Sequence, residues 1–157
     1  MRAALLCVGK LKEKYWRDAC AEYLKRLTRY GQVELIEVPD APEPAHASPG
    51  ADAQVLHIEG ERLLAKIRPD DYVIALAIDG KSYTSVGFAE HVEKVMLKGR
   101  MVFVIGGSLG LSPEVYARAN ERISFSALTF PHQMMRVIFL EQLYRACRIQ
   151  AKEPYHK

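Results

Sequence analysis

This sequence of 157 residues lacks long apolar segments, paired cysteine motifs and the familiar short catalytic motifs. Its longest apolar runs, such as 73–78, are far shorter than the roughly 20 residues that a membrane-spanning helix needs. The N-terminus has one arginine before six apolar residues, without the small-residue cleavage site of a secretory signal. We therefore expect a cytoplasmic protein with no membrane contact.

Cysteine and histidine spacings give no support for a metal site or a disulfide framework. Cys7, Cys20 and Cys147 lie far apart with no C-x-x-C pair, which predicts reduced and buried thiols. The five histidines show neither H-x-x-x-H nor H-E-x-x-H spacing, and no phosphate loop, dinucleotide fingerprint or nucleophile elbow is present. We expect no metal, no nucleoside triphosphate site and no serine nucleophile.

Charge is unevenly distributed around a net value of +3. Residues 2–30 carry eight Lys and Arg against three Asp and Glu, whereas residues 32–61 carry seven acidic residues and no Lys or Arg. Basic segments of this kind are compatible with binding a polyanion, although a mildly basic balance is too common to establish it.

Apolar patterning alternates between strands and helices along the whole chain. Strands are predicted at 3–8, 33–38, 72–78, 101–105 and 123–125. Helices are predicted at 13–30, 52–67, from Thr84 or Ser85 onward, at 113–119 and at 132–149, with Asp52 as the N-cap of the second. The segment 39–51, with four prolines, is predicted to be a loop and 79–81 a turn. This order predicts one α/β domain over 1–157, an open and mainly parallel sheet with helices on both faces.

Ligands of open parallel sheets bind beyond the carboxyl ends of the strands, where the segments 9–10, 79–81, 106–110 and 126–132 are expected. The loop 106–110 is rich in glycine, which lets a ligand approach the backbone closely, but the same pattern serves a tight strand-to-helix turn.

The last helix carries more apolar surface than a single sheet contact requires. His132 and Arg136 share one face, and a second polar stripe is formed by Glu141, Arg145 and Arg148. Two interpretations stay open, a helix in a homodimer interface and a closely packed core helix.

Six segments together carry a resemblance to a known family. They are V-G-K-L-K-E-K-Y-W (8–16), D-G-K (79–81), V-F-V-I-G-G-S-L-G-L (102–111), S-F-S-A-L-T-F-P-H-Q-M-M-R-V (124–137), E-Q-L-Y-R-A (141–146) and P-Y-H-K (154–157). The sequence resembles the ribosomal RNA large subunit methyltransferase H family, small single-domain members of the SPOUT class. The resemblance runs from the first predicted strand to the last residue, and the loop 39–51 is its least family-like part.

The resemblance implies methylation, with S-adenosylmethionine, of N3 of a pseudouridine in helix 69 of 23S rRNA on assembled ribosomes. It also implies a cytoplasmic homodimer whose subunits carry a C-terminal trefoil knot, which general topology rules would have argued against. Two alternatives remain: a SPOUT methyltransferase that acts on another RNA such as tRNA, and a non-catalytic ribosome-binding module.

The family pattern gives the cofactor contacts, and physical reasoning adds expected roles for further residues. Cofactor contacts fall on Leu76, Gly106, Phe125, Ser126, Ala127, Leu128, Thr129 and Phe130. Gly106 is expected to leave room for the cofactor. The imide N3–H must lose its proton, and His132, Glu141 or His156 could accept it. Tyr155 is expected to stack on a base, and a partner subunit is expected to contribute both Tyr155 and His156 to the site. Phosphates are expected at Arg136, Arg145 and Arg148.

Overall fold

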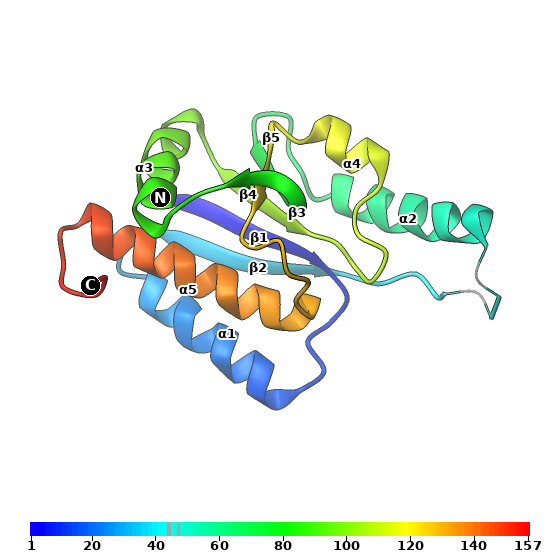
Figure 1. Ribbon diagram of the computed structural model, residues 1–157, viewed down its shortest axis with the longest axis horizontal. Coiled ribbons are helices and arrows are strands. Elements are labelled where there is room, and N and C mark those ends of the chain that lie inside the picture. The colour runs from blue at the N-terminus through cyan, green and yellow to red at the C-terminus, as the bar shows by residue number, and fades with distance from the viewer. Residues whose placement is uncertain (44, 47) are drawn as a thin grey trace.

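A five-stranded sheet forms the centre of the computed structural model, which describes residues 1–43, 45–46 and 48–157 (Figure 1). The strands are β1 (Arg2–Val8), β2 (Gln32–Val38), β3 (Tyr72–Ser82), β4 (Met101–Ile105) and β5 (Glu121–Ser124). Their order is β2-β1-β4-β3-β5, and neighbouring strands pair in parallel. The predicted open parallel sheet is confirmed.

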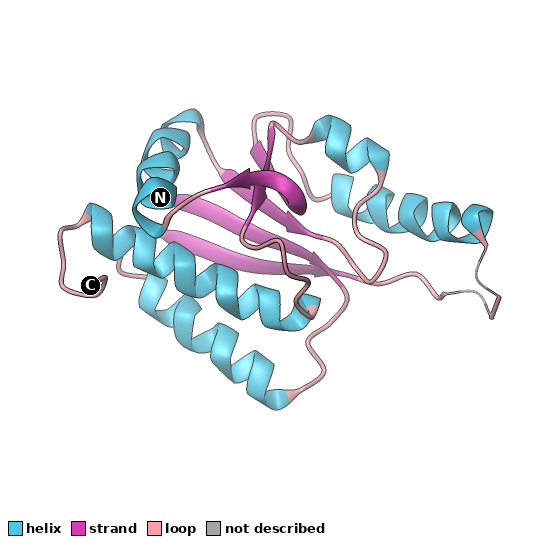
Figure 2. Cartoon of the chain, in the orientation of Figure 1, coloured by secondary structure: helices cyan, strands magenta, loops and turns pink. Residues whose placement is uncertain are grey.

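Helices cover both faces of this sheet (Figure 2). One face carries α1 (Lys14–Leu27), α3 (Ser85–Val95) with its 3-10 extension η1 (Met96–Lys98), and α5 (His132–Gln150). The other face carries α2 (Pro49–Leu64) and α4 (Pro113–Arg118). Successive residues of a strand point to opposite faces, so Leu5 packs in the core beneath Phe139 of α5, whereas Leu6 packs with Leu63 of α2. Strands buried on both sides explain the continuous apolar runs.

Several predicted boundaries differ from the structure by a few residues, and two of the differences have a clear local reason. Helix α2 begins at Pro49 rather than after Asp52, because the Ser48 hydroxyl accepts a hydrogen bond from the amide of Ala51 at 3.2 Å and proline suits the first helical position. Strand β3 continues to Ser82, so 79–81 is not a turn between elements. Both Leu76 and Lys81 pair with Ile123, which makes residues 77–80 a bulge within the strand.

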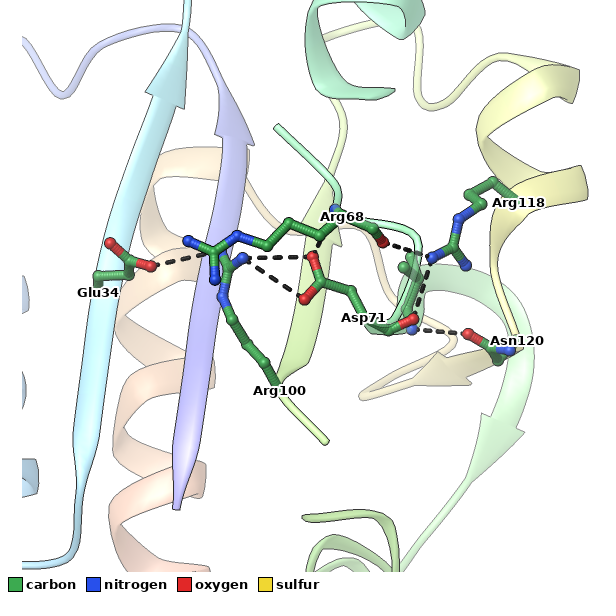
Figure 3. Close-up of polar contacts among 7 residues, drawn as sticks. Glu34, Arg68, Asp71, Arg100, Arg118 and Asn120 are labelled. Carbon is green, nitrogen blue, oxygen red and sulfur yellow. Dashed lines mark hydrogen bonds and ion pairs between the residues drawn. The ribbon is translucent and has the colours of Figure 1, made fainter. Parts of the chain in front are cut away.

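A polar network around the buried side chains of Asp71 and Arg100 fixes the amino ends of β3 and β4, at the edge of the sheet opposite the carboxyl ends (Figure 3). Oδ2 of Asp71 accepts hydrogen bonds from the Arg68 amide at 2.7 Å and from Nη1 of Arg100 at 3.2 Å. Arg118 donates to the carbonyls of Arg68 and Asp71, each at 3.0 Å, and Arg100 also pairs with Glu34 of β2 at 3.3 Å. These bonds join the sheet to α4 and serve the fold.

The three cysteines are buried and form no disulfide, as predicted, and burial raises the pKa of Cys7 to about 12. In the described part of the chain, no helix has the length and apolar character needed to cross a membrane. Among the same residues, no cluster of three or more His, Cys, Asp and Glu side chains could hold a metal ion.

Candidate functional site

A cavity of about 870 Å³ lies at the carboxyl ends of β3, β4 and β5. Most of its lining comes from three segments: 76–79 at the bulge of β3, 105–111 at the end of β4 and in the loop after it, and 122–132 in β5 and the chain that joins it to α5. Tyr116 of α4 and Met135 of α5 complete the lining. Its walls are mainly apolar and hydroxyl-bearing, and within the described chain Asp79 and Arg122 are the only Asp, Glu, Lys or Arg residues in its lining. A cavity of this size and composition is typical of a cofactor site.

The fold brings together seven of the eight residues for which the sequence predicts cofactor contact. Those lining the cavity are Leu76, Gly106, Phe125, Ser126, Leu128, Thr129 and Phe130. Ala127 is exposed and lies outside the lining. His132, a candidate proton acceptor, also lines the cavity, whereas Glu141, Tyr155 and His156 do not.

The segment 124–130 is anchored beside the cavity by its own hydrogen bonds and by the packing of Phe125. The Ser126 hydroxyl accepts a hydrogen bond from the amide of Leu128 at 2.9 Å, and the Ser124 hydroxyl donates to the Ser126 carbonyl at 3.0 Å. Phe125 packs against Phe88 and Phe139, with ring centroids 5.4 and 5.9 Å apart. The segment is thus held from the core side, while Leu128 stays 70% exposed beside the cavity.

Gly106 has the structural role that the sequence analysis gave as the alternative, a glycine in a tight turn after a strand. A Cβ atom at Gly106 would overlap the carbonyl of Gly110, because Gly107 and Gly110 form a bridge that folds the loop back on itself. Gly110 has φ +85°, a conformation that favours glycine. The space that a side chain at position 106 would need is therefore filled by the loop, while Gly106 itself lines the cavity.

His132 lies where the large cavity meets a second cavity of about 210 Å³. Burial, and next the nearby charge of Arg136, lowers the pKa of His132 below its usual 6.5. The imidazole is therefore neutral at neutral pH and has a nitrogen free to accept a proton.

Glu59, in the second cavity, lies four residues after Val55 and four before Leu63, on the buried stripe of α2. It is buried, and its Oε2 accepts a hydrogen bond from the amide of Ala41 at 3.1 Å. Its Oε1 has no hydrogen-bond partner among the described residues, and burial raises its pKa. The sequence signal that could have revealed this buried carboxyl group is an acidic residue at a position where the helix pattern calls for an apolar one.

Arg136 does not fit the prediction that it holds a phosphate. Its side chain is fully buried, and Nη2 donates to the carbonyls of Val8 and Gly9 at 2.8 and 2.9 Å. Nη1 pairs with Oε2 of Glu37 at 2.8 Å, and the same oxygen accepts from the amide of Leu11. Arg136 therefore fixes the loop after β1, and in this structure an RNA phosphate cannot reach it.

The other candidate residues gather at the C-terminal half of α5. Oε1 of Glu141 accepts hydrogen bonds from Nη2 of Arg145 at 2.6 Å and from the Tyr155 hydroxyl at 3.0 Å. Nδ1 of His156 lies 3.4 Å from Nη1 of Arg145. Glu141 follows His132 by nine residues, about 13 Å along the helix axis. Within one chain, this cluster is therefore well separated from the cavity.

Glu153 holds the C-terminal tail in this position through three side-chain contacts. Its carboxylate pairs with Arg29 and Arg148, each at 2.8 Å, and accepts a hydrogen bond from Tyr30 at 2.5 Å. The predicted phosphate ligands Arg145 and Arg148 are thus bound to Glu141 and Glu153, and both side chains are largely buried.

Comparisons with known proteins agree over the whole chain. Residues 1–156 match a family described as "Predicted SPOUT methyltransferase". The chain is 53% identical over 159 residues to "Ribosomal RNA large subunit methyltransferase H" of Streptococcus thermophilus and 54% identical to the protein of that name from Exiguobacterium sibiricum, each alignment covering all of both proteins.

A solved structure supports the fold independently. It is that of a probable methylase family protein from Haemophilus influenzae Rd KW20, with a TM-score of 0.56 and 17% identity over 99% of this chain and 70% of the other. At this identity the likeness concerns the fold alone.

Proposed function

Because the chain belongs to the ribosomal RNA large subunit methyltransferase H family of SPOUT methyltransferases, we propose that it methylates N3 of pseudouridine 1915 in 23S rRNA. The acceptor lies in helix 69 of assembled ribosomes, and the methyl donor is S-adenosylmethionine, which SPOUT methyltransferases use. The observation that carries the proposal is the cavity of about 870 Å³ at the carboxyl ends of the strands.

The residues of this cavity fit S-adenosylmethionine. Its apolar walls suit an adenine ring, and the hydroxyl-bearing residues Ser126 and Thr129 in the lining offer polar groups to a ligand. Ile78 and Leu128, two of the large apolar side chains exposed in the described chain, both line it, as expected where a ligand covers them. The bound cofactor supplies an electrophilic methyl group, so the protein must position the acceptor nitrogen and take its proton.

His132 is the proposed proton acceptor. It lies at the cavity, and its lowered pKa keeps the imidazole neutral near pH 7. Tyr155 does not suit the role of proton acceptor, because burial and its hydrogen bond to Glu141 raise its pKa to about 12 and the hydroxyl stays protonated. The carboxylate of Glu141 is already engaged by Arg145 and Tyr155.

The active unit in this proposal is a homodimer in which the tail of one subunit approaches the cavity of the other. The separation between the tail cluster and His132 within one chain supports this arrangement. We also propose the C-terminal trefoil knot, supported by the meeting of 77–79, 106–110 and 125–131 around one cavity.

Methylation of purified ribosomes tests the substrate. Ribosomes that lack the modification are incubated with the protein and S-adenosylmethionine, and the methylated nucleotide is mapped by mass spectrometry. The proposal predicts one added methyl group at pseudouridine 1915, with none in free tRNA. Methylation of tRNA alone would identify another RNA as substrate. Ribosome binding with neither methylation nor calorimetric binding of S-adenosylmethionine would favour a non-catalytic ribosome-binding module.

Mixing two inactive variants tests the dimer. One variant, Leu128→Arg, blocks the cavity but keeps the tail, and the other lacks residues 154–157 but keeps the cavity. If the tail acts in trans, mixed dimers contain one complete site, and about a quarter of wild-type turnover should return on statistical exchange. No recovery in dimers shown to have exchanged would place the tail and cavity of one site in the same subunit.

A further inference from the structure

A charged pair lies in the lining of an otherwise uncharged cavity. Nη1 of Arg122, in the edge strand β5, lies 3.0 Å from Oδ2 of Asp79, in the bulge of β3. The Arg122 guanidinium also stacks on Tyr116 of α4, with its central carbon 3.9 Å from the ring centroid. All three residues line the cavity, and none of them belongs to the contacts that the family pattern predicts.

This pair contributes little to the fold. The side chain of Arg122 is 43% exposed and that of Asp79 more so, and an exposed ion pair adds little stability because water screens it. Tyr116 nevertheless restrains the guanidinium plane, so its N–H edge remains available to a ligand while its face rests on the ring. The guanidinium of Arg122 is therefore held in place beside the cavity before any ligand binds.

The ligand chemistry that matches this position is a zwitterion. S-adenosylmethionine ends in an α-amino acid, in which a carboxylate and an ammonium group are attached to the same carbon. A guanidinium binds a carboxylate through two parallel hydrogen bonds, and an aspartate accepts hydrogen bonds from an ammonium group. A cation and an anion 3.0 Å apart can engage both ends of such a ligand.

We propose that Arg122 binds the carboxylate and Asp79 the ammonium group of the cofactor's amino-acid end. This inference rests on the proposed function and adds the orientation of the cofactor. The rest of the described lining offers no other Asp, Glu, Lys or Arg, and His132 is neutral at neutral pH. The amino-acid end therefore lies toward the edge strand β5, and the adenine lies toward the loops 106–110 and 125–130.

Calorimetry with two ligands tests the assignment. S-adenosylmethionine carries the amino-acid end, and 5′-methylthioadenosine retains the adenosine and sulfur but lacks that end. The variant is Arg122→Gln. Its control is Arg26→Gln, because Arg26 is 42% exposed, pairs with Glu22 at 2.9 Å and contacts the ring of Tyr23, but lies on α1 outside the cavity lining.

Arg122→Gln should weaken S-adenosylmethionine binding about tenfold, because a charge-assisted pair at a partly exposed position is lost. Binding of 5′-methylthioadenosine should change less than about twofold, and Arg26→Gln should change neither Kd. Asp79→Asn should show the same selectivity for the complete ligand.

Equal weakening of both ligands by Arg122→Gln, or no weakening of either, would overturn the assignment while leaving the cavity as the cofactor site. If the wild-type protein binds neither ligand, the proposed function itself fails. Circular dichroism melts of each variant establish that the fold is intact before the binding constants are compared.

Discussion

Replacing Arg136 by methionine tests whether this arginine serves the fold or the RNA. Methionine keeps an unbranched chain of similar length, so it fills the buried space while removing the guanidinium. The change removes the ion pair with Glu37 at 2.8 Å and the hydrogen bonds to the carbonyls of Val8 and Gly9. These contacts of Arg136 fix the carboxyl end of β1 and the loop after it.

The expected loss of stability follows from burial. Removing one partner of a buried ion pair costs roughly 3–5 kcal/mol, because the other charge is left without compensation. The Glu37 side chain is partly exposed and retains its hydrogen bond from Leu11, so water can recover part of that cost. We expect a loss of about 3 kcal/mol in the free energy of unfolding, which for a chain of this size lowers Tm by roughly 6–12 °C.

Urea unfolding at pH 7 and fixed protein concentration measures this difference, and ribosome affinity is measured in parallel. Arg136→Lys should lie between the wild type and the methionine variant, because it keeps a charge but loses the planar donor geometry. A methionine variant within about 1 kcal/mol of the wild type, yet with weakened and less salt-dependent ribosome binding, would refute the structural role and restore the phosphate prediction.

Three further predictions address the cavity, the proton acceptor and the polar network. Leu128→Arg should weaken S-adenosylmethionine binding at least about tenfold by calorimetry. Leu97 is 82% exposed and lies outside the cavity lining, so Leu97→Arg should leave Kd unchanged, and equal effects of the two variants would show a nonspecific effect of charge. His132→Asn should lower kcat about 100-fold or more while cofactor Kd stays within twofold, and an unchanged kcat would exclude this base. Wild-type turnover should fall only below pH 6.5, because the pKa of His132 is lowered and the imidazole stays neutral down to that pH. As the pH falls, His132 takes up a proton in the unfolded chain before it does in the folded protein, because folding lowers its pKa. Its contribution to the free energy of unfolding is therefore complete above pH 6.5 and decreases below that pH. Chemical unfolding of His132→Asn should not show this decrease. Asp71→Ala should cost about 3 kcal/mol in urea unfolding without changing cofactor Kd, since it leaves Arg100 buried beside a single exposed partner; a cost under about 1 kcal/mol would contradict the role of the network.

Local patterns predicted most of the elements because each depends on nearby residues. The apolar run of β4, and the serine and proline that begin α4, are correctly placed by the sequence alone. The bulge at 77–80 could not be predicted in this way, because it exists only where Leu76 and Lys81 both pair with Ile123, more than 40 residues away. The same limit applies to Glu59, whose burial depends on the approach of Ala41.

The sequence by itself determined the fold class, the family and the segments that line the cavity, because periodicity and motifs are properties of neighbouring residues. Only the tertiary structure decided which charged side chains line the cavity and which are enclosed in the fold. Arg136 and Arg122 are both arginines near strand ends, yet Arg136 is enclosed by β1 and Glu37, whereas Arg122 stands at the cavity beside Asp79. The cost of burying a charge is met by partners from distant segments, and their positions are fixed only when the sheet and helices pack.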